Sequence, residues 1–109
     1  MADRLSLVQG TLDVLVLKAV SWGPIRGYGV SRLIDQKSKG ALVVDEAALY
    51  QALHRLARQG LVDATWGVSE NNRRARFYEL TPRGRSRLRA DVKWWEDYAS
   101  AMSRVLEAT

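Results

Sequence analysis

The sequence predicts a mainly α-helical fold with a small β component (α+β), and three observations support this class. Apolar residues recur at helical spacing in the segments 4–20, 27–38, 46–59 and 82–106. Two β-prone segments, 61–66 and 74–80, flank a polar turn at 67–73. With 109 residues, of which 47% are hydrophobic, the chain is long enough for one compact domain with a modest core.

The first half of the chain predicts two helices and a short strand. Residues 4–20 form the first helix, because apolar side chains lie on one stripe at Leu5, Val8, Leu12, Leu15, Val16 and Ala19. Leu7, Val14 and Leu17 fall outside that stripe, so we expect a second buried contact on this helix. Gly23-Pro24 ends it, residues 27–38 form a short second helix, and residues 41–44 form a single strand.

The third helix is predicted at 46–59, with Asp45 as its N-cap and Gly60 just past its end. Its buried stripe is Leu49, Leu53 and Leu56. After the hairpin, Thr81-Pro82 begins a fourth helix that runs to about Leu106, with threonine as N-cap and proline at the first helical position.

The fourth helix carries two apolar seams side by side. One seam steps by four and three residues through Leu88, Val92, Trp95, Ala99, Met102 and Leu106, and the other contains Trp94, Tyr98, Ala101 and Val105. A monomer with one small sheet cannot cover both seams and the surplus apolar face of the first helix, so we expect a two-fold homodimer. The alternative is a fourth helix that folds back over its own domain. The expected dimer residues are Leu7, Val14, Leu88, Val92, Trp94, Trp95, Tyr98, Met102, Val105 and Leu106.

Positive charge is concentrated in one stretch of the chain. The net charge is +5, but between Asn71 and Arg89 there are seven arginines and one acidic residue, Glu79. From Ala90 to Thr109 the balance reverses, with four acids and two bases. A local basic field of this kind indicates a nucleic-acid partner.

The order of elements, three helices with a strand before the third and a hairpin after it, is that of a winged helix-turn-helix. Residues 1–81 would form the DNA-binding domain and residues 82–109 the dimerisation helix, within one structural unit. A helix fits the major groove of DNA. The third helix offers an exposed face for it, composed of Ala47, Ala48, Tyr50, Gln51, His54, Arg55 and Arg58. Gln51 suits an adenine edge, and Tyr50 and Arg55 suit phosphates. The alternative is an ordinary solvated helix face.

The hairpin strengthens the nucleic-acid prediction. Its tip and the start of its second strand gather five hydrogen-bonding side chains, Asn71, Asn72, Arg73, Arg74 and Arg76. Arginine is suited to phosphates and to narrow minor grooves. A merely solubilising turn is the alternative, and seven arginines against one acid in this stretch disfavour it.

Three motifs together resemble the PadR family of bacterial transcriptional regulators, in particular its small members with one C-terminal helix. They are GYGVSRLID (27–35), ALYQALHRLARQGLV (48–62) and NNRRARFYELTPRGRSRL (71–88). The resemblance implies a winged helix-turn-helix homodimer, usually a repressor of a palindromic operator. It implies that Tyr50 lies at the DNA and that Gly27-Tyr28 opens the second helix, so Tyr28 joins the expected DNA contacts. Gln51 stands where members often carry proline, so another member's base preference does not transfer.

Other functions have weaker support. One histidine, His54, and no cysteine predict neither an enzyme nor a metal site, and no cofactor is expected. Two alternatives stay open, an RNA-binding module and a protein-interaction module. Trp94 and Trp95 either fill the core and the dimer seam or line a pocket for a small aromatic effector, which some family members bind. We expect Trp22 and Trp66 in the core or at its edge. No segment is apolar enough to span a membrane and no secretory signal is apparent, so a cytoplasmic protein is expected.

Overall fold

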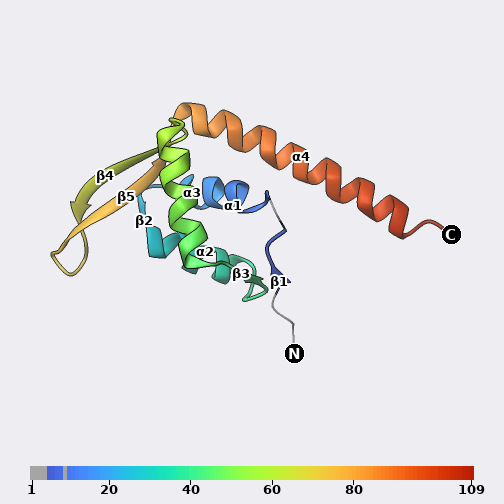
Figure 1. Cartoon of the computed structure of the whole chain (residues 1–109), viewed down its shortest axis with the longest axis horizontal. Helices are drawn as coiled ribbons and strands as arrows, with labels where there is room; N and C mark the ends of the chain where they lie inside the picture. The colour runs from blue at the N-terminus through green and yellow to red at the C-terminus, as the bar shows by residue number, and fades with distance from the viewer. Residues whose placement is uncertain (1–4, 9) are drawn as a thin grey trace.

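The computed structural model describes residues 5–8 and 10–109, and its longest feature is the C-terminal helix. The elements in order are β1 (Leu5–Ser6), α1 (Leu12–Val20), β2 (Ile25–Arg26), α2 (Gly27–Lys37), β3 (Leu42–Val43), α3 (Glu46–Arg58), β4 (Val62–Val68), β5 (Arg74–Leu80) and α4 (Pro82–Leu106). Helices α1, α2 and α3 pack together, the β4–β5 hairpin projects from one side, and α4 extends from the other (Figure 1). The α+β fold predicted from the sequence is confirmed.

The prediction of one helix over residues 4–20 was wrong at its N-terminal end. Helix α1 begins at Leu12, after Gly10, whose φ of 90° lies outside the helical region. Leu5 and Ser6 instead form β1, which pairs in parallel with Leu42 and Val43 of β3. The start of the predicted helix, residue 4, and position 9 lie outside the described residues. The expected strand at 41–44 is therefore real but shorter, and its pairing partner lies far away in the sequence.

Helices α2 and α3 form the helix-turn-helix pair over the centre of the core. The buried stripe predicted for α3 is confirmed, since Leu49, Leu53 and Leu56 have no exposed surface. They pack with Val16 and Leu17 of α1, which are also fully buried, and with further buried side chains from α2, β4 and α4. Leu17, which lay outside the predicted stripe of the first helix, thus belongs to the core of its own chain. Burial of these aliphatic groups is the main stabilising contribution to the fold.

The wing is part of a three-stranded sheet, whereas the sequence predicted two strands. The strand order is β2-β5-β4, with both neighbouring pairs antiparallel. The missed strand, β2, is only two residues long and follows the Gly23-Pro24 turn, so it carries no periodic signal. Strand β4 runs two residues further than the predicted 61–66, through Gly67 and Val68, and the turn shortens to residues 69–73.

The start of α4 is locked onto the end of α3. The Thr81 side chain accepts a hydrogen bond from the Gly84 amide at 2.9 Å and donates to the Gly60 carbonyl oxygen at 2.8 Å. Gly84 lies so close to Leu61, the residue before β4, that a Cβ there would be 1.9 Å from the Leu61 carbonyl oxygen. This close approach fixes the direction in which α4 leaves the domain. Beyond Leu88 no residue of α4 is buried, and the helix extends away from the rest of the domain (Figure 1).

Candidate nucleic-acid interface

Helix α3 presents a continuous exposed face on the side opposite to its leucines. Asp45 caps the helix, accepting a hydrogen bond from the Ala48 amide at 2.9 Å, so its first turn is well defined. Ala47, Gln51 and His54 are exposed and follow each other at intervals of three and four residues. Because Ala47 is small and Ala48 is half-buried, no large side chain protrudes from these two positions at the N-terminal end of this face. Helix α3 can therefore approach the floor of a groove, with Gln51 at its centre.

Tyr50 joins α3 to the first turn of α2. A Cβ at Gly27 would lie 2.5 Å from the Tyr50 ring, so only glycine lets the ring rest there. Partial burial raises the pKa of the Tyr50 hydroxyl above its usual value of 10.0, and the Glu46 carboxylate raises this pKa further. The hydroxyl therefore stays protonated at neutral pH and can donate a hydrogen bond to an anion.

Arg26 and Tyr28 lie at the same end of α2. The Arg26 guanidinium is stacked 4.8 Å from the centre of the Tyr28 ring, and its charge lowers the pKa of the Tyr50 hydroxyl, against the larger effects of burial and Glu46. Tyr28 keeps 41% of its surface exposed. Arg26 is a cation of this site that sequence reasoning missed, because only its pairing with Phe77 across β2 and β5 shows where it lies.

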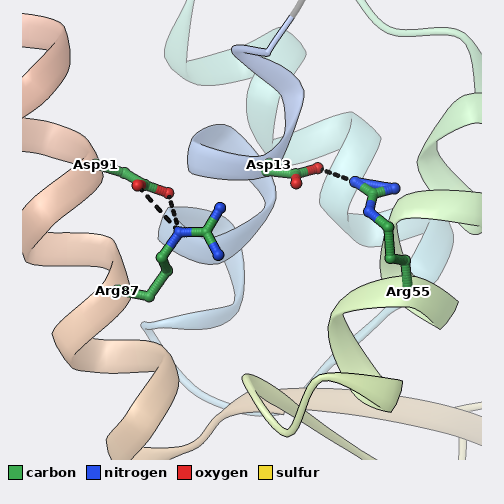
Figure 2. Close-up of polar contacts among 4 residues, drawn as sticks. All are labelled: Asp13, Arg55, Arg87 and Asp91. Carbon is green, nitrogen blue, oxygen red and sulfur yellow. Dashed lines mark hydrogen bonds and ion pairs between the residues drawn. The ribbon is translucent and has the colours of Figure 1, made fainter.

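The sequence suggested that Arg55 lies free on the exposed face of α3, but the structure shows it paired. Its guanidinium donates to the carboxylate of Asp13 on α1 (Figure 2). The two residues are 42 positions apart, so no local pattern could reveal the pair. The ion pair ties α3 to α1, and a phosphate contact through Arg55 would have to compete with Asp13.

The turn at the tip of the wing has a defined backbone. The Ser69 amide donates to the Arg73 carbonyl oxygen at 2.7 Å, and the Asn72 amide donates to the Ser69 carbonyl oxygen at 2.9 Å. Asn72 has a φ of 58°, in the left-handed region that asparagine tolerates better than most residues. Asn72 thus has a conformational reason to be there, while Asn71 and Arg73 are exposed on the turn.

Trp66 lies on the wing surface, and the expectation that it packs in the core or at its edge was wrong. It is 57% exposed and pairs directly with Arg76 across the hairpin. The guanidinium carbons of Arg74 and Arg76 lie 4.5 and 5.3 Å from the centre of its ring. These contacts hold the two arginines over one aromatic surface. The pattern W-x-V before the turn and R-x-R after it would have indicated this face, had the hairpin register been known.

The basic stretch of residues 71–89 divides into two separate surfaces. Arg73, Arg74 and Arg76 are on the wing, whereas four arginines, at 83, 85, 87 and 89, are on the first turns of α4. Arg87 is neutralised by Asp91 one turn later, with 3.1 Å between the arginine Nε and the carboxylate (Figure 2). No carboxylate within residues 5–8 and 10–109 forms an ion pair with Arg73, Arg74 or Arg76. The wing is therefore the surface with uncompensated positive charge beside α3.

Most side chains expected at a dimer interface are exposed in the single chain. Trp94, Trp95 and Tyr98 are 58%, 43% and 48% exposed, and both indoles stack on the tyrosine, with ring centres 5.2 and 6.3 Å from it. Val92, Met102, Val105 and Leu106 are also exposed. Leu88 is buried against its own core, and Val14 packs beside that core. Leu7 is half-buried in the connection between β1 and α1, so it is not on a helix.

Other kinds of site find no support in the described part of the chain. Its single histidine and its acidic residues form no group of three or more that could hold a metal ion. None of the helices there is both long and apolar enough to cross a membrane.

A helix-turn-helix pair with an exposed second helix, flanked by a basic hairpin, defines a winged-helix DNA-binding protein. The profile of the transcriptional regulator PadR-like family matches residues 16–90. The chain belongs to this family of DNA-binding transcriptional regulators, which are not enzymes. The expected resemblance to the PadR family is confirmed, whereas the assignment to its small members stays a prediction.

Solved structures agree in fold over most of the chain. A transcriptional regulator from Clostridium thermocellum is 27% identical with a TM-score of 0.79, over 88% of this chain and 90% of that one. The smu.1704 protein of Streptococcus mutans is also 27% identical, with a TM-score of 0.79, over 89% and 87% of the two chains. A PadR-like transcriptional regulator from Bacillus cereus is 21% identical, with a TM-score of 0.80 over 93% and 96%, which shows the fold alone. A protein of Lysinibacillus sphaericus, described as "Uncharacterized protein X", is 24% identical over 104 residues, or 95% of each chain.

Proposed function

We propose that this protein is a homodimeric repressor that binds a palindromic operator through helix α3, within residues 46–59, and through the wing, residues 67–76. The observation that carries the proposal is the exposed face of α3 around Gln51, beside a wing whose arginines have no carboxylate partner in the described chain. Gln51 would read a base edge, Tyr50 and Tyr28 would contact the backbone, and Arg73, Arg74 and Arg76 would bind phosphates. Arg55 contributes less, because Asp13 already engages it.

The homodimer is supported by the apolar surface of α4. A helix whose tryptophans, tyrosine, methionine and terminal leucine are all exposed on one chain has an unfavourable surface in water. A two-fold partner helix would cover this surface and set two α3 helices about 34–36 Å apart, one DNA turn. Trp94 and Trp95 then lie at or near the interface, where a small flat aromatic effector would compete with their own packing and release the operator.

The test is selection of bound fragments from genomic DNA by the purified protein, with light scattering of the free protein for its mass. An enriched inverted repeat, with half-sites about one helical turn apart, and a dimeric mass would support the proposal. Deletion of the gene should then raise transcription from promoters that carry the repeat. If transcription from these promoters falls in the deletion strain instead, the protein is an activator. The absence of any enriched sequence would refute operator recognition.

Exposure of Trp66 favours one alternative enough to test it in parallel. Aromatic rings beside arginines are the usual platform for unpaired bases. Single-stranded RNA and DNA of mixed sequence should therefore be included as competitors. Competition stronger than that of the selected duplex would make the wing a single-strand binding surface.

A further inference from the structure

Trp22 was also predicted in the core or at its edge, and this prediction was wrong, because the side chain is exposed. It follows α1, in the turn before β2, and 58% of its surface is exposed. The Lys18 ammonium lies 4.9 Å and the Lys37 ammonium 5.6 Å from the centre of its ring. Two cations from different helices thus converge on one aromatic side chain, at the end of α2 remote from Tyr28.

A cavity of about 250 Å³ opens beside the indole, between α1 and α2. Apart from Trp22, Ser38 and the two lysines, its walls are aliphatic: Leu15, Ala19, Leu33, Ile34 and Leu42. A second hollow, lined by Gly23, Pro24 and Ile25, adjoins the first and shares Ala19, Trp22, Leu33 and Lys37 with it. The indole therefore lines two hollows that are otherwise largely apolar, and two ammonium groups lie near its ring.

Within residues 5–8 and 10–109, the two lysines have no carboxylate partner to balance their charge. Neither forms an ion pair with a carboxylate in the part of the chain that the structure describes, and their ammonium groups repel each other near the same ring. The cation–π contacts offset only part of this repulsion at an exposed site. An external anion between the two ammonium groups would remove it, and an apolar group attached to that anion would fill the cavity below.

We propose that the cavity between α1 and α2 is a binding site for a medium-chain aliphatic carboxylate, whose carboxylate contacts Lys18 and Lys37 beside Trp22 and whose alkyl chain lies against Leu15, Leu33 and Leu42. The volume falls below the ~300–1,000 Å³ of typical drug-sized sites, which favours a small ligand. Its aliphatic walls suit a flexible chain better than they suit a flat ring. The site is separate from α3 and the wing, and it does not depend on the proposed operator binding.

The experiment is a titration of the full chain with sodium octanoate, followed by calorimetry and by the indole N–H signals in two-dimensional NMR. The Trp22→Phe variant identifies the Trp22 signal among those of the four tryptophans. We expect saturable binding of one octanoate per chain, with the Trp22 signal shifting most. The Lys18→Gln, Lys37→Gln double variant should bind octanoate at least ten-fold more weakly than the wild type does. The wild-type protein should likewise bind neutral octanol at least ten-fold more weakly than octanoate. Lys93→Gln, which removes a lysine of α4 paired with Asp97, is the matched control and should bind as the wild type does.

Three results would overturn the proposal. Absence of saturable binding at millimolar octanoate would exclude the site. Equal binding by the double lysine variant or by octanol would leave a nonspecific apolar surface. A shift of the Trp94 or Trp95 signal larger than that of Trp22 would show that the ligand binds at α4. These measurements use the protein and the ligand without DNA. A negative result here therefore says nothing about DNA binding, and a negative result in operator selection does not contradict carboxylate binding at this site.

Discussion

Removing the two arginines at the tip of the wing should change how DNA affinity depends on salt. Arg73 and Arg74 are exposed, and neither has a carboxylate partner within the described residues. Each phosphate that an arginine neutralises contributes about −0.9 to the slope of log K against log salt concentration. The double variant Arg73→Ala, Arg74→Ala should therefore lose roughly 1.8 units of slope per chain and about 3.6 per homodimer. Between 0.1 and 0.2 M salt the wild-type affinity should fall roughly twelve-fold more than that of the variant.

The assay is fluorescence anisotropy of a labelled selected duplex, at about six salt concentrations between 50 and 300 mM. The matched control is Arg83→Ala with Arg85→Ala, which removes the same charge from exposed positions at the start of α4. It should reduce the slope by less than about one unit per dimer. An unchanged slope in the wing variant would remove the wing from the interface. Equal reductions in both variants would show that net charge matters and position does not.

Three further changes test the recognition helix, the dimer and the packing of α4. Gln51→Ala should lose about 1–3 kcal/mol of discrimination at one base pair per half-site, measured with single-substituted duplexes; equal loss on every sequence would make Gln51 a backbone contact. Trp95→Glu should give a monomeric mass in light scattering and abolish tight operator binding, whereas Ser100→Glu on the opposite side of α4 should not; a Trp95→Glu dimer would mean that the other seam is used. Gly84→Ala should lower the free energy of unfolding by about 1–3 kcal/mol in urea denaturation, because the new Cβ would collide with the Leu61 carbonyl oxygen. Helix propensity alone predicts a gain of about 1 kcal/mol, so stabilisation would refute the packing argument.

Local sequence patterns were sufficient for most of α2, α3 and α4. The N-caps at Asp45 and Thr81 and the glycine after α3 are where the sequence placed them, because capping depends on residues within one turn. At the C-terminal end of α3 the Leu61 amide donates to the Leu56 carbonyl oxygen at 3.0 Å, as a glycine-terminated helix requires. The α+β class follows from these local signals.

Contacts between distant residues explain where sequence reasoning was wrong. Residues 5 and 6 were assigned to a helix because their apolar spacing fits one, but pairing with β3 makes them a strand. Trp22 and Trp66 were predicted in the core or at its edge because they are large and apolar. Each is instead exposed beside two cations. Trp22 has Lys18 of α1 and Lys37 of α2, and Trp66 has Arg74 and Arg76 of the paired strand β5.

Periodicity, capping and motifs depend on neighbouring residues, so they were enough to predict α2, α3 and α4, the basic hairpin and the membership of a DNA-binding family. Which of the charged side chains remain available for a ligand depends instead on the folded structure. It pairs Arg55 with Asp13, gathers Arg74 and Arg76 on Trp66, and separates the wing from the arginines of α4. The physical reason is that ion pairs and ring contacts act over a few ångströms of space, and the fold alone determines which residues come that close.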